Sequence, residues 1–312
     1  MPARTNSHVI RDPLLYCDQQ LFDEERERVF KRSWALACHV SEVPRPGDAR
    51  VVVHAIGVAV ALRRYDDSVR ASEVGGAKRR VRTEVDCAGF VWMHLDEYAP
   101  SLRWYFAGAL DRIAPTLSAE PFDVFAFERT TVNANWKTAS RDAERRERSV
   151  CDSSRFEHDP SILHPAYFHS QHREYPNGHV SAADRCVRYD GFSGRASRTL
   201  ALPGRLPDQW TAAAIFPRVE YRICGSSLRV DAVTPAAPGR AVVETWGLAP
   251  SSDTRKERAQ RVREFDAIWG PAGCAREGTP HLEGFGERAF YAEWERRLGR
   301  SASDPFREAL AG

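Results

Sequence analysis

Short segments with the composition of β-strands follow one another between residues 50 and 95. RVVV, GVAVALR, RRVRTEV and GFVWMHL are rich in valine and aromatic residues, and the turn-forming sequences YDDS and EVGG lie between them. No internal repeat or low-complexity tract interrupts the pattern. The sequence therefore predicts a small β domain in this part of the chain.

Segments with helical spacing flank this β domain. Residues 18–34 place apolar side chains near one stripe, and Asp18 is positioned to cap the helix. A closing helix, ERAFYAEWERRL, sets Phe290, Trp294 and Leu298 on a single face. We also expect helices over 102–118 and 253–268, and strands over 121–135 and around TAAAIFPRVEY, SSLRVDAV and RAVVETWGLA. The fold class is α+β, with strands that curl around helices.

Composition narrows the classes of function. The 45 Lys and Arg residues nearly balance 43 Asp and Glu residues, so no global field favours nucleic acid or an anionic membrane. No apolar run is long enough for a membrane span, and the opening residues lack the apolar core of a signal peptide. Seven scattered cysteines suit a reduced compartment better than a disulfide framework. We expect a cytoplasmic protein whose cysteines are mostly buried thiols.

Several phrases, in order along nearly the whole chain, resemble the large (alpha) subunit of aromatic-ring-hydroxylating Rieske dioxygenases. They are LFDEERERVFKRSWALACHVSEVPRPGD, GFVWMHLDE, NANWK, NGH, IFP, LRVDAVTP, VVETWGLA, GPAG and RAFYAEW. The resemblance implies a Rieske-type β domain with flanking helices over residues 1–120. It also implies a helix-grip domain of the START or Bet v 1 type over residues 121–312. Family members commonly form trimers, in which the cluster of one subunit supplies electrons to the iron of its neighbour.

The chain departs from this family where the iron–sulfur cluster would be bound. A Rieske cluster needs two cysteine and two histidine ligands, which the family presents on two loops. In this chain the only link between the corresponding strands is SEVGGAK, and the adjacent Cys38 and His39 cannot substitute because no second pair exists. We therefore expect the cluster-binding subdomain to be missing and the protein to carry no cofactor.

The family's mononuclear iron site also fails to match. Its iron is held by two histidines and a carboxylate at a fixed distance after NWK. Ungapped counting from Lys137 places Arg146 at the bridging aspartate and Ser149 and Ser154 at the two histidines. The third ligand falls near Gly278 or Thr279. The resemblance therefore implies four degenerate positions and no metal.

The segment after NWK offers other candidate residues. Residues 141–148, RDAERRER, carry seven charges in eight positions, which predicts a solvated helix or loop. The alternative is an arginine-rich rim, with Arg141 and Arg146 as contacts for an anionic substrate. Histidines follow at 158, 164, 169, 172 and 179. We expect these histidines to lie on the surface. One alternative is that one of them acts as an acid or base in catalysis. The other is that two of them, with Glu157 or Asp159, form a relocated metal site.

Three functions remain open. The first is a metal-independent, non-oxidative enzyme of bacterial specialised metabolism that acts on an aromatic or polyketide-like molecule. Its catalytic residues would be His164, which has apolar neighbours, with His158 and Asp159. The second is a non-catalytic subunit that assembles with a related Rieske oxygenase or with itself. The third is an oxygenase with a relocated iron site.

Overall fold

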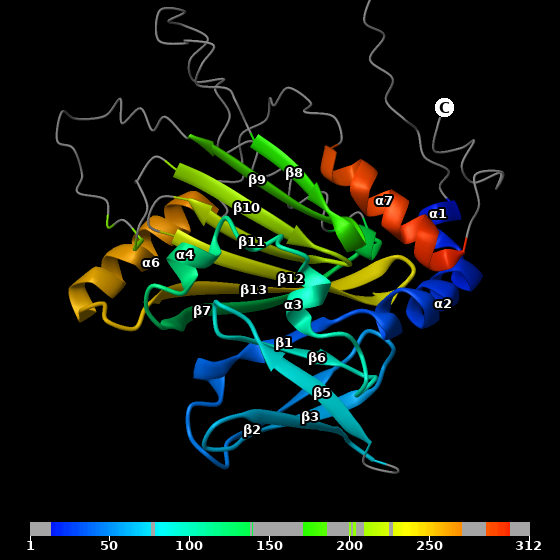
Figure 1. The fold of residues 1–312 in the computed structure, drawn as a ribbon, viewed down its shortest axis with the longest axis horizontal. Coiled ribbons are helices and arrows are strands. Elements are labelled where there is room, and N and C mark those ends of the chain that lie inside the picture. Colours follow the sequence, from blue (N-terminus) through cyan, green and yellow to red (C-terminus); the bar gives the residue numbers. More distant parts are fainter. Residues whose placement is uncertain are drawn as a thin grey trace, which may run out of the picture.

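The computed structural model describes residues 14–75, 79–137, 139, 171–185, 200, 202–203, 209–224, 227–269 and 285–299. The nine residues proposed above as site positions (141, 146, 149, 154, 158, 159, 164, 278 and 279) lie outside these ranges. None of the helices within the ranges combines the length and the apolar character that a membrane span needs. The described chain forms two antiparallel sheets with helices around them (Figure 1).

A six-stranded sheet forms the lower part of the view in Figure 1. Its strand order is β1-β6-β5-β4-β3-β2, and every pair is antiparallel. Alternate side chains such as Val60, Leu62 and Val69 turn into its own apolar core. The strands are β1 (Ala35–His39), β2 (Ala49–Val53), β3 (Ala59–Arg64), β4 (Val69–Glu73), β5 (Arg80–Val85) and β6 (Phe90–His94).

A seven-stranded antiparallel sheet forms the upper part, in the order β7-β13-β12-β11-β10-β9-β8. Whether the two sheets are separate domains divided at residue 120 stays a prediction. The α+β class with antiparallel sheets is confirmed. The strands are β7 (Phe122–Val132), β8 (Gln171–Tyr175), β9 (His179–Arg185), β10 (Gln209–Ile215), β11 (Val219–Cys224), β12 (Ser227–Ala237) and β13 (Arg240–Pro250).

The helices lie around the sheets. They are α1 (Leu14–Cys17), α2 (Gln19–Arg28), α3 (Leu102–Phe106), α4 (Ala114–Leu117), α6 (Arg255–Trp269) and α7 (Phe285–Leu298), with short 3₁₀ turns η1 (Phe30–Arg32), η2 (Val40–Glu42) and η5 (Pro176–Gly178). The predicted cap of α2 is confirmed, because Asp18 Oδ1 accepts a hydrogen bond of 2.6 Å from Leu21 N. The closing helix is confirmed too, and Phe290, Trp294 and Leu298 are buried in one cluster.

Two expectations about elements are wrong. The helix expected over 102–118 is two short helices, because Ala107 and Gly108 adopt left-handed backbone angles (φ of 50° and 90°) that end α3. The strand expected around TAAAIFPRVEY is two strands, β10 and β11, because the chain turns at Phe216–Arg218. In both cases the type of element, helix or strand, was predicted correctly, but the turn that divides it into two was not.

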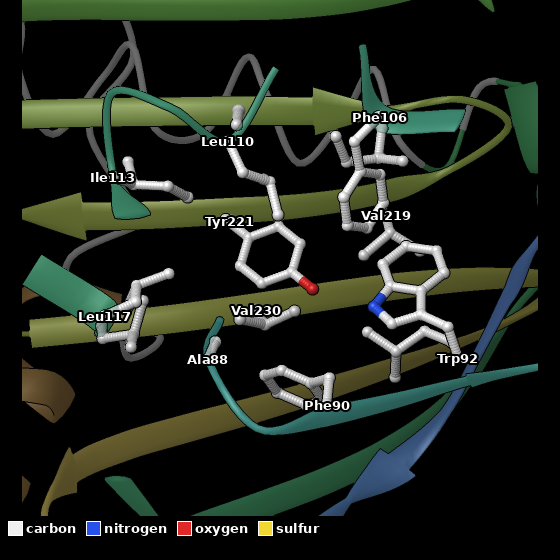
Figure 2. Close-up of a cluster of buried hydrophobic side chains, with 14 of the residues drawn as sticks. Ala88, Phe90, Trp92, Phe106, Leu110, Ile113, Leu117, Val219, Tyr221 and Val230 are labelled. Carbon is white, nitrogen blue, oxygen red and sulfur yellow. The ribbon is translucent and has the colours of Figure 1, made fainter. Parts of the chain in front are cut away.

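The two sheets share one apolar core. Phe90 and Trp92 of β6 pack with α3, α4 and one face of β11 and β12, as Figure 2 shows. Figure 2 also shows the Tyr221 hydroxyl and the Trp92 indole nitrogen turned toward each other. Both donate hydrogen bonds to the carboxylate of Asp86, in the turn before β6. The face of the upper sheet that carries Tyr221 and Val230 is therefore filled by packing.

Candidate functional site

The link between β4 and β5 is a tight hairpin. Ala71 pairs with Val81 and Ser72 with Arg80, and Glu73 N donates a hydrogen bond of 3.0 Å to Arg79 O. Residues 74–78, VGGAK, are all that remain between these paired positions, and they include no cysteine or histidine. The residues present here do not fit a Rieske cluster, which needs two thiolates and two imidazoles.

The cysteines and histidines that the structure describes do not form a metal site. Cys17 is exposed, Cys38 is buried and Cys87 is half-buried. Nε2 of His39 donates to Ala88 O at 2.8 Å, because its Nδ1 already accepts from Ser41 N. Within the described part of the chain, no three His, Cys, Asp or Glu side chains are grouped to hold a metal ion.

His179, the last residue of the predicted histidine cluster, is fully buried rather than on the surface. Its Nδ1 accepts from Phe216 N at 2.9 Å, so its Nε2 carries the proton and donates to Tyr105 O at 2.7 Å. Burial lowers the pKa of His179 from 6.5 to about 4. A neutral imidazole held by two backbone groups joins α3 to the sheet, which is a structural role.

Opposite the packed face, the upper sheet carries a group of charges, which we call the ionic cluster: the buried Glu220, Arg222 and Asp231, with the half-buried Arg229. Strand alternation places it there, because Tyr221 and Val230 turn into the shared core and their neighbours turn the other way. Arg222 Nη1 lies 2.5 Å from Asp231 Oδ2, and its Nη2 donates to Glu220. Thr245 Oγ1 donates to Asp231 Oδ1.

Like charges lie directly opposite each other within the ionic cluster. The antiparallel register of β11 and β12 pairs Glu220 with Asp231 and Arg222 with Arg229. The ion pairs therefore run diagonally between strands or along one strand, from Arg222 to both acids and from Arg229 to Asp231 at 2.9 Å. One end of the cluster is acidic and the other is basic.

Two helices bound the ionic cluster on its face of the sheet. At one end, a side chain at Gly247, which is paired with Arg229, would meet Phe265 of α6 at 3.0 Å. At the other end, Val233 of β12 belongs to the buried cluster of Phe290 and Trp294 of α7. In Figure 1, α6 and α7 lie toward opposite ends of the upper sheet. Both helices therefore contact the face of the sheet that carries the ionic cluster.

A second buried group fixes the NWK motif at the start of the segment that carries the predicted ligand positions. Lys137 Nζ lies 2.5 Å from Glu25 Oε1, and both side chains are at most 1% exposed. The same carboxylate accepts from the indole nitrogens of Trp136 (2.7 Å) and Trp294 (2.9 Å). The motif is therefore tied to both α2 and α7.

Sequence reasoning missed the ionic cluster. V-E-Y-R-I and R-V-D alternate charged with apolar residues, which predicts strands but does not indicate that the charged face is buried. The predicted residues of the segment after NWK cannot be placed, since they lie outside the described ranges.

No family model matches the chain. Among curated proteins, it is 26% identical to the 2-aminobenzenesulfonate 2,3-dioxygenase alpha subunit of an Alcaligenes species, over 97% of each chain. It is 28% identical to the methanesulfonate monooxygenase hydroxylase alpha subunit of Methylosulfonomonas methylovora, over 88% of this chain and 83% of that protein. The biphenyl dioxygenase alpha subunit of Paraburkholderia xenovorans is 42% identical over only 59 residues.

The alignment with the Alcaligenes protein is longer than this chain. Because 97% of 312 residues is about 303, about 85 of the 388 aligned positions have no counterpart here. Among solved structures, naphthalene 1,2-dioxygenase with bound indole has a TM-score of 0.68 at 16% identity, covering 96% of this chain and 94% of that one. A quaternary ammonium Rieske monooxygenase has a TM-score of 0.61 at 15% identity, covering 84% and 81%. These structures establish a shared fold.

Proposed function

We propose that this chain, a homologue of Rieske dioxygenase alpha subunits, is a Rieske oxygenase-like protein that has lost its redox centres and acts on a small molecule without metal or oxygen. The β4–β5 hairpin carries the proposal. It leaves five residues, without cysteine or histidine, where the family places two ligand loops. The lower sheet is then a reduced Rieske-type domain, and the upper sheet with α6 and α7 is a helix-grip domain.

Oxygen activation needs electrons delivered to an open metal position. A chain without its own cluster lacks the internal donor, so proton transfer and binding are the chemistry left to its side chains. An imidazole contributes typically 10²- to 10⁴-fold by acid–base catalysis. We propose His164 for this role and Arg146 for an anion contact, on the sequence grounds given above.

The substrate we propose is a small molecule with a sulfonate or similar anionic group. The two relatives that align over most of the chain are named for sulfonates, whereas the biphenyl enzyme shares only 59 residues. Guanidinium groups recognise oxyanions well, which agrees with the anion contact proposed for Arg146.

The test is to measure the iron and acid-labile sulfide in the purified protein and the oxygen dependence of its activity. After expression with added iron and cysteine, we expect a colourless protein without stoichiometric iron or acid-labile sulfide. Turnover of sulfonated aromatic compounds would then persist under anaerobic conditions with a chelator, and fall in His164→Ala. About two atoms each of iron and sulfide per chain, or turnover that requires oxygen and reductant, would contradict the proposal.

A second candidate function is that of a subunit that assembles with a related Rieske oxygenase or with itself. Strand β2 is an edge of the lower sheet and exposes Val51 (61%) and Val53 (55%). Exposed apolar residues on an unpaired edge favour contact with another chain. Co-purification with a ligand-bearing alpha subunit that Val51→Lys abolishes would support this candidate. Equal co-purification of the variant would argue against it.

A further inference from the structure

A cleft of about 70 Å³, which we call the inter-sheet cleft, lies between the two sheets. Residues of β1 and β2 line it from the lower sheet, and residues of β7, β12 and β13 line it from the upper sheet. We propose that this cleft binds a small oxyanion, a sulfonate or carboxylate with a short apolar chain, between Arg50 of β2 and Arg129 of β7. Neither arginine belongs to the site proposed for the reaction, so this inference goes beyond the proposed function.

Arg50 is held in place by one nitrogen of its guanidinium group. Its Nη1 donates to Glu42, whose Oε2 accepts from His39 N at 2.7 Å and from Trp246 Nε1 at 3.2 Å. The side chain crosses to the upper sheet, where its Cζ lies 5.2 Å from the ring centroid of Phe127. Within the described ranges, Nε and Nη2 of Arg50 donate no hydrogen bond. A positioned guanidinium group with unused donors therefore lines the cleft.

Arg129 and Glu244 line the cleft from the upper sheet. They are directly opposite each other on β7 and β13, two residues beyond the pair of Phe127 and Trp246, so all four side chains lie on one face of the sheet. Arg129 Nε lies 3.8 Å from Glu244 Oε1, which is longer than a hydrogen bond. Neither side chain is hydrogen-bonded to another described residue. The fold thus leaves the donors of Arg129 available to a ligand.

The volume of the inter-sheet cleft limits the size of the ligand. One water-sized position takes about 10–15 Å³, so the cleft holds about five or six non-hydrogen atoms. Most of the other lining side chains are apolar, such as Ala35, Val52 and Val242, and they would cover a short alkyl chain. Guanidinium groups bind oxyanions through charge-assisted hydrogen bonds. A sulfonate or carboxylate with about two or three carbon atoms therefore fits both the room and the donors.

Glu244 couples the binding of an anion to the uptake of a proton. Burial raises the pKa of its carboxyl group, although the charges of Arg129 and Arg50 oppose the rise. A bound anion would raise this pKa further, because it disfavours an ionised carboxylate beside it. The affinity for the anion should therefore increase as the pH falls toward the pKa of Glu244. The other charged or titratable groups that act on Glu244 or line the cleft are Glu42, Cys38, His54 and Arg218.

Isothermal titration with ethanesulfonate and ethanesulfonamide tests the inference, since these two probes have the same size and differ in charge. We expect ethanesulfonate to bind at least about tenfold more tightly than the sulfonamide, because the anion alone forms charge-assisted hydrogen bonds. Its affinity should rise as the pH is lowered from about 8 to about 6, a range in which the sulfonate stays ionised. Equal affinities for the two probes, or no binding of either, would overturn the inference.

Three variants locate the binding. Arg129→Gln should weaken ethanesulfonate at least about tenfold, and the fold should tolerate the change because Arg129 is 57% exposed. Glu244→Gln should bind ethanesulfonate with an affinity that no longer depends on pH. Arg63→Gln is the matched control, since Arg63 is exposed on β3 and does not line the cleft. Unchanged binding in Arg129→Gln, or an equal loss in Arg63→Gln, would show that the anion does not bind in the cleft.

Discussion

Lys137 and Glu25 form a fully buried ion pair, with 2.5 Å between Nζ and Oε1. The ammonium group also lies over the rings of Trp136 (5.0 Å) and Trp294 (5.6 Å), and each of these indoles donates to Glu25. Burying a charge is unfavourable unless it is paired and hydrogen-bonded, and here the carboxylate accepts three donors. One carboxylate in α2 therefore holds the NWK motif and α7 together.

We expect Glu25→Ala to lower the free energy of unfolding by about 3–5 kcal/mol, because it leaves the Lys137 ammonium buried without its counter-ion. Urea unfolding followed by tryptophan fluorescence measures the loss. Glu27→Ala is the matched control two residues away, since Glu27 is 61% exposed and pairs with Lys31 on the surface. Its effect should be about 0–1 kcal/mol. Similar losses in both variants would mean that the buried pair does not stabilise the fold.

The sequence predicts the features that local spacing determines. The Asp18 cap and the apolar face of α7 follow from residues within a few positions of one another, and both are confirmed. The ionic cluster could not be predicted, because alternating charged residues on a strand normally face water. Glu220 and Arg222 are nevertheless buried, and their ion pairs join residues on two strands. The prediction of one helix over 102–118 was also wrong, because nothing in the composition of that segment indicates that Ala107 adopts left-handed backbone angles.

Tyr221→Phe removes one of four groups that donate to the buried Asp86 carboxylate, along with Trp92 Nε1 and the backbone N–H groups of Ala88 and Phe90. Burial raises the pKa of Asp86, and these donors oppose that rise. We expect a loss of about 1–3 kcal/mol in unfolding free energy. Tyr98→Phe, at 84% exposure, is the control and should leave stability unchanged. A loss in neither variant would show that the Tyr221 bond does not couple the sheets.

A substitution at Gly178 tests the contact between η5 and α7. Its φ is +74°, and a Cβ there would lie 2.6 Å from Glu293 Cβ. We expect Gly178→Ala to destabilise the protein by more than the roughly 1 kcal/mol of left-handed backbone strain alone. Gly47→Ala isolates that strain, because Gly47 has a φ of +94° and open space around its Cβ position. Equal losses in the two variants, measured by thermal unfolding, would mean that α7 shifts freely away from η5.

Acid should destabilise the fold through its buried histidines. Burial lowers the pKa of His54 from 6.5 to about 4, and its buried Nε2 has no hydrogen-bond partner. The unfolded state therefore binds the proton first as pH falls, so this contribution to stability is complete above pH 6.5 and is lost between pH 6.5 and 4. One such group accounts for about 3 kcal/mol over that window. His54→Leu removes it, so we expect the variant to lose stability less steeply than the wild type between pH 6.5 and 4.5. Parallel curves of unfolding free energy against pH would show that His54 is not buried in its neutral form.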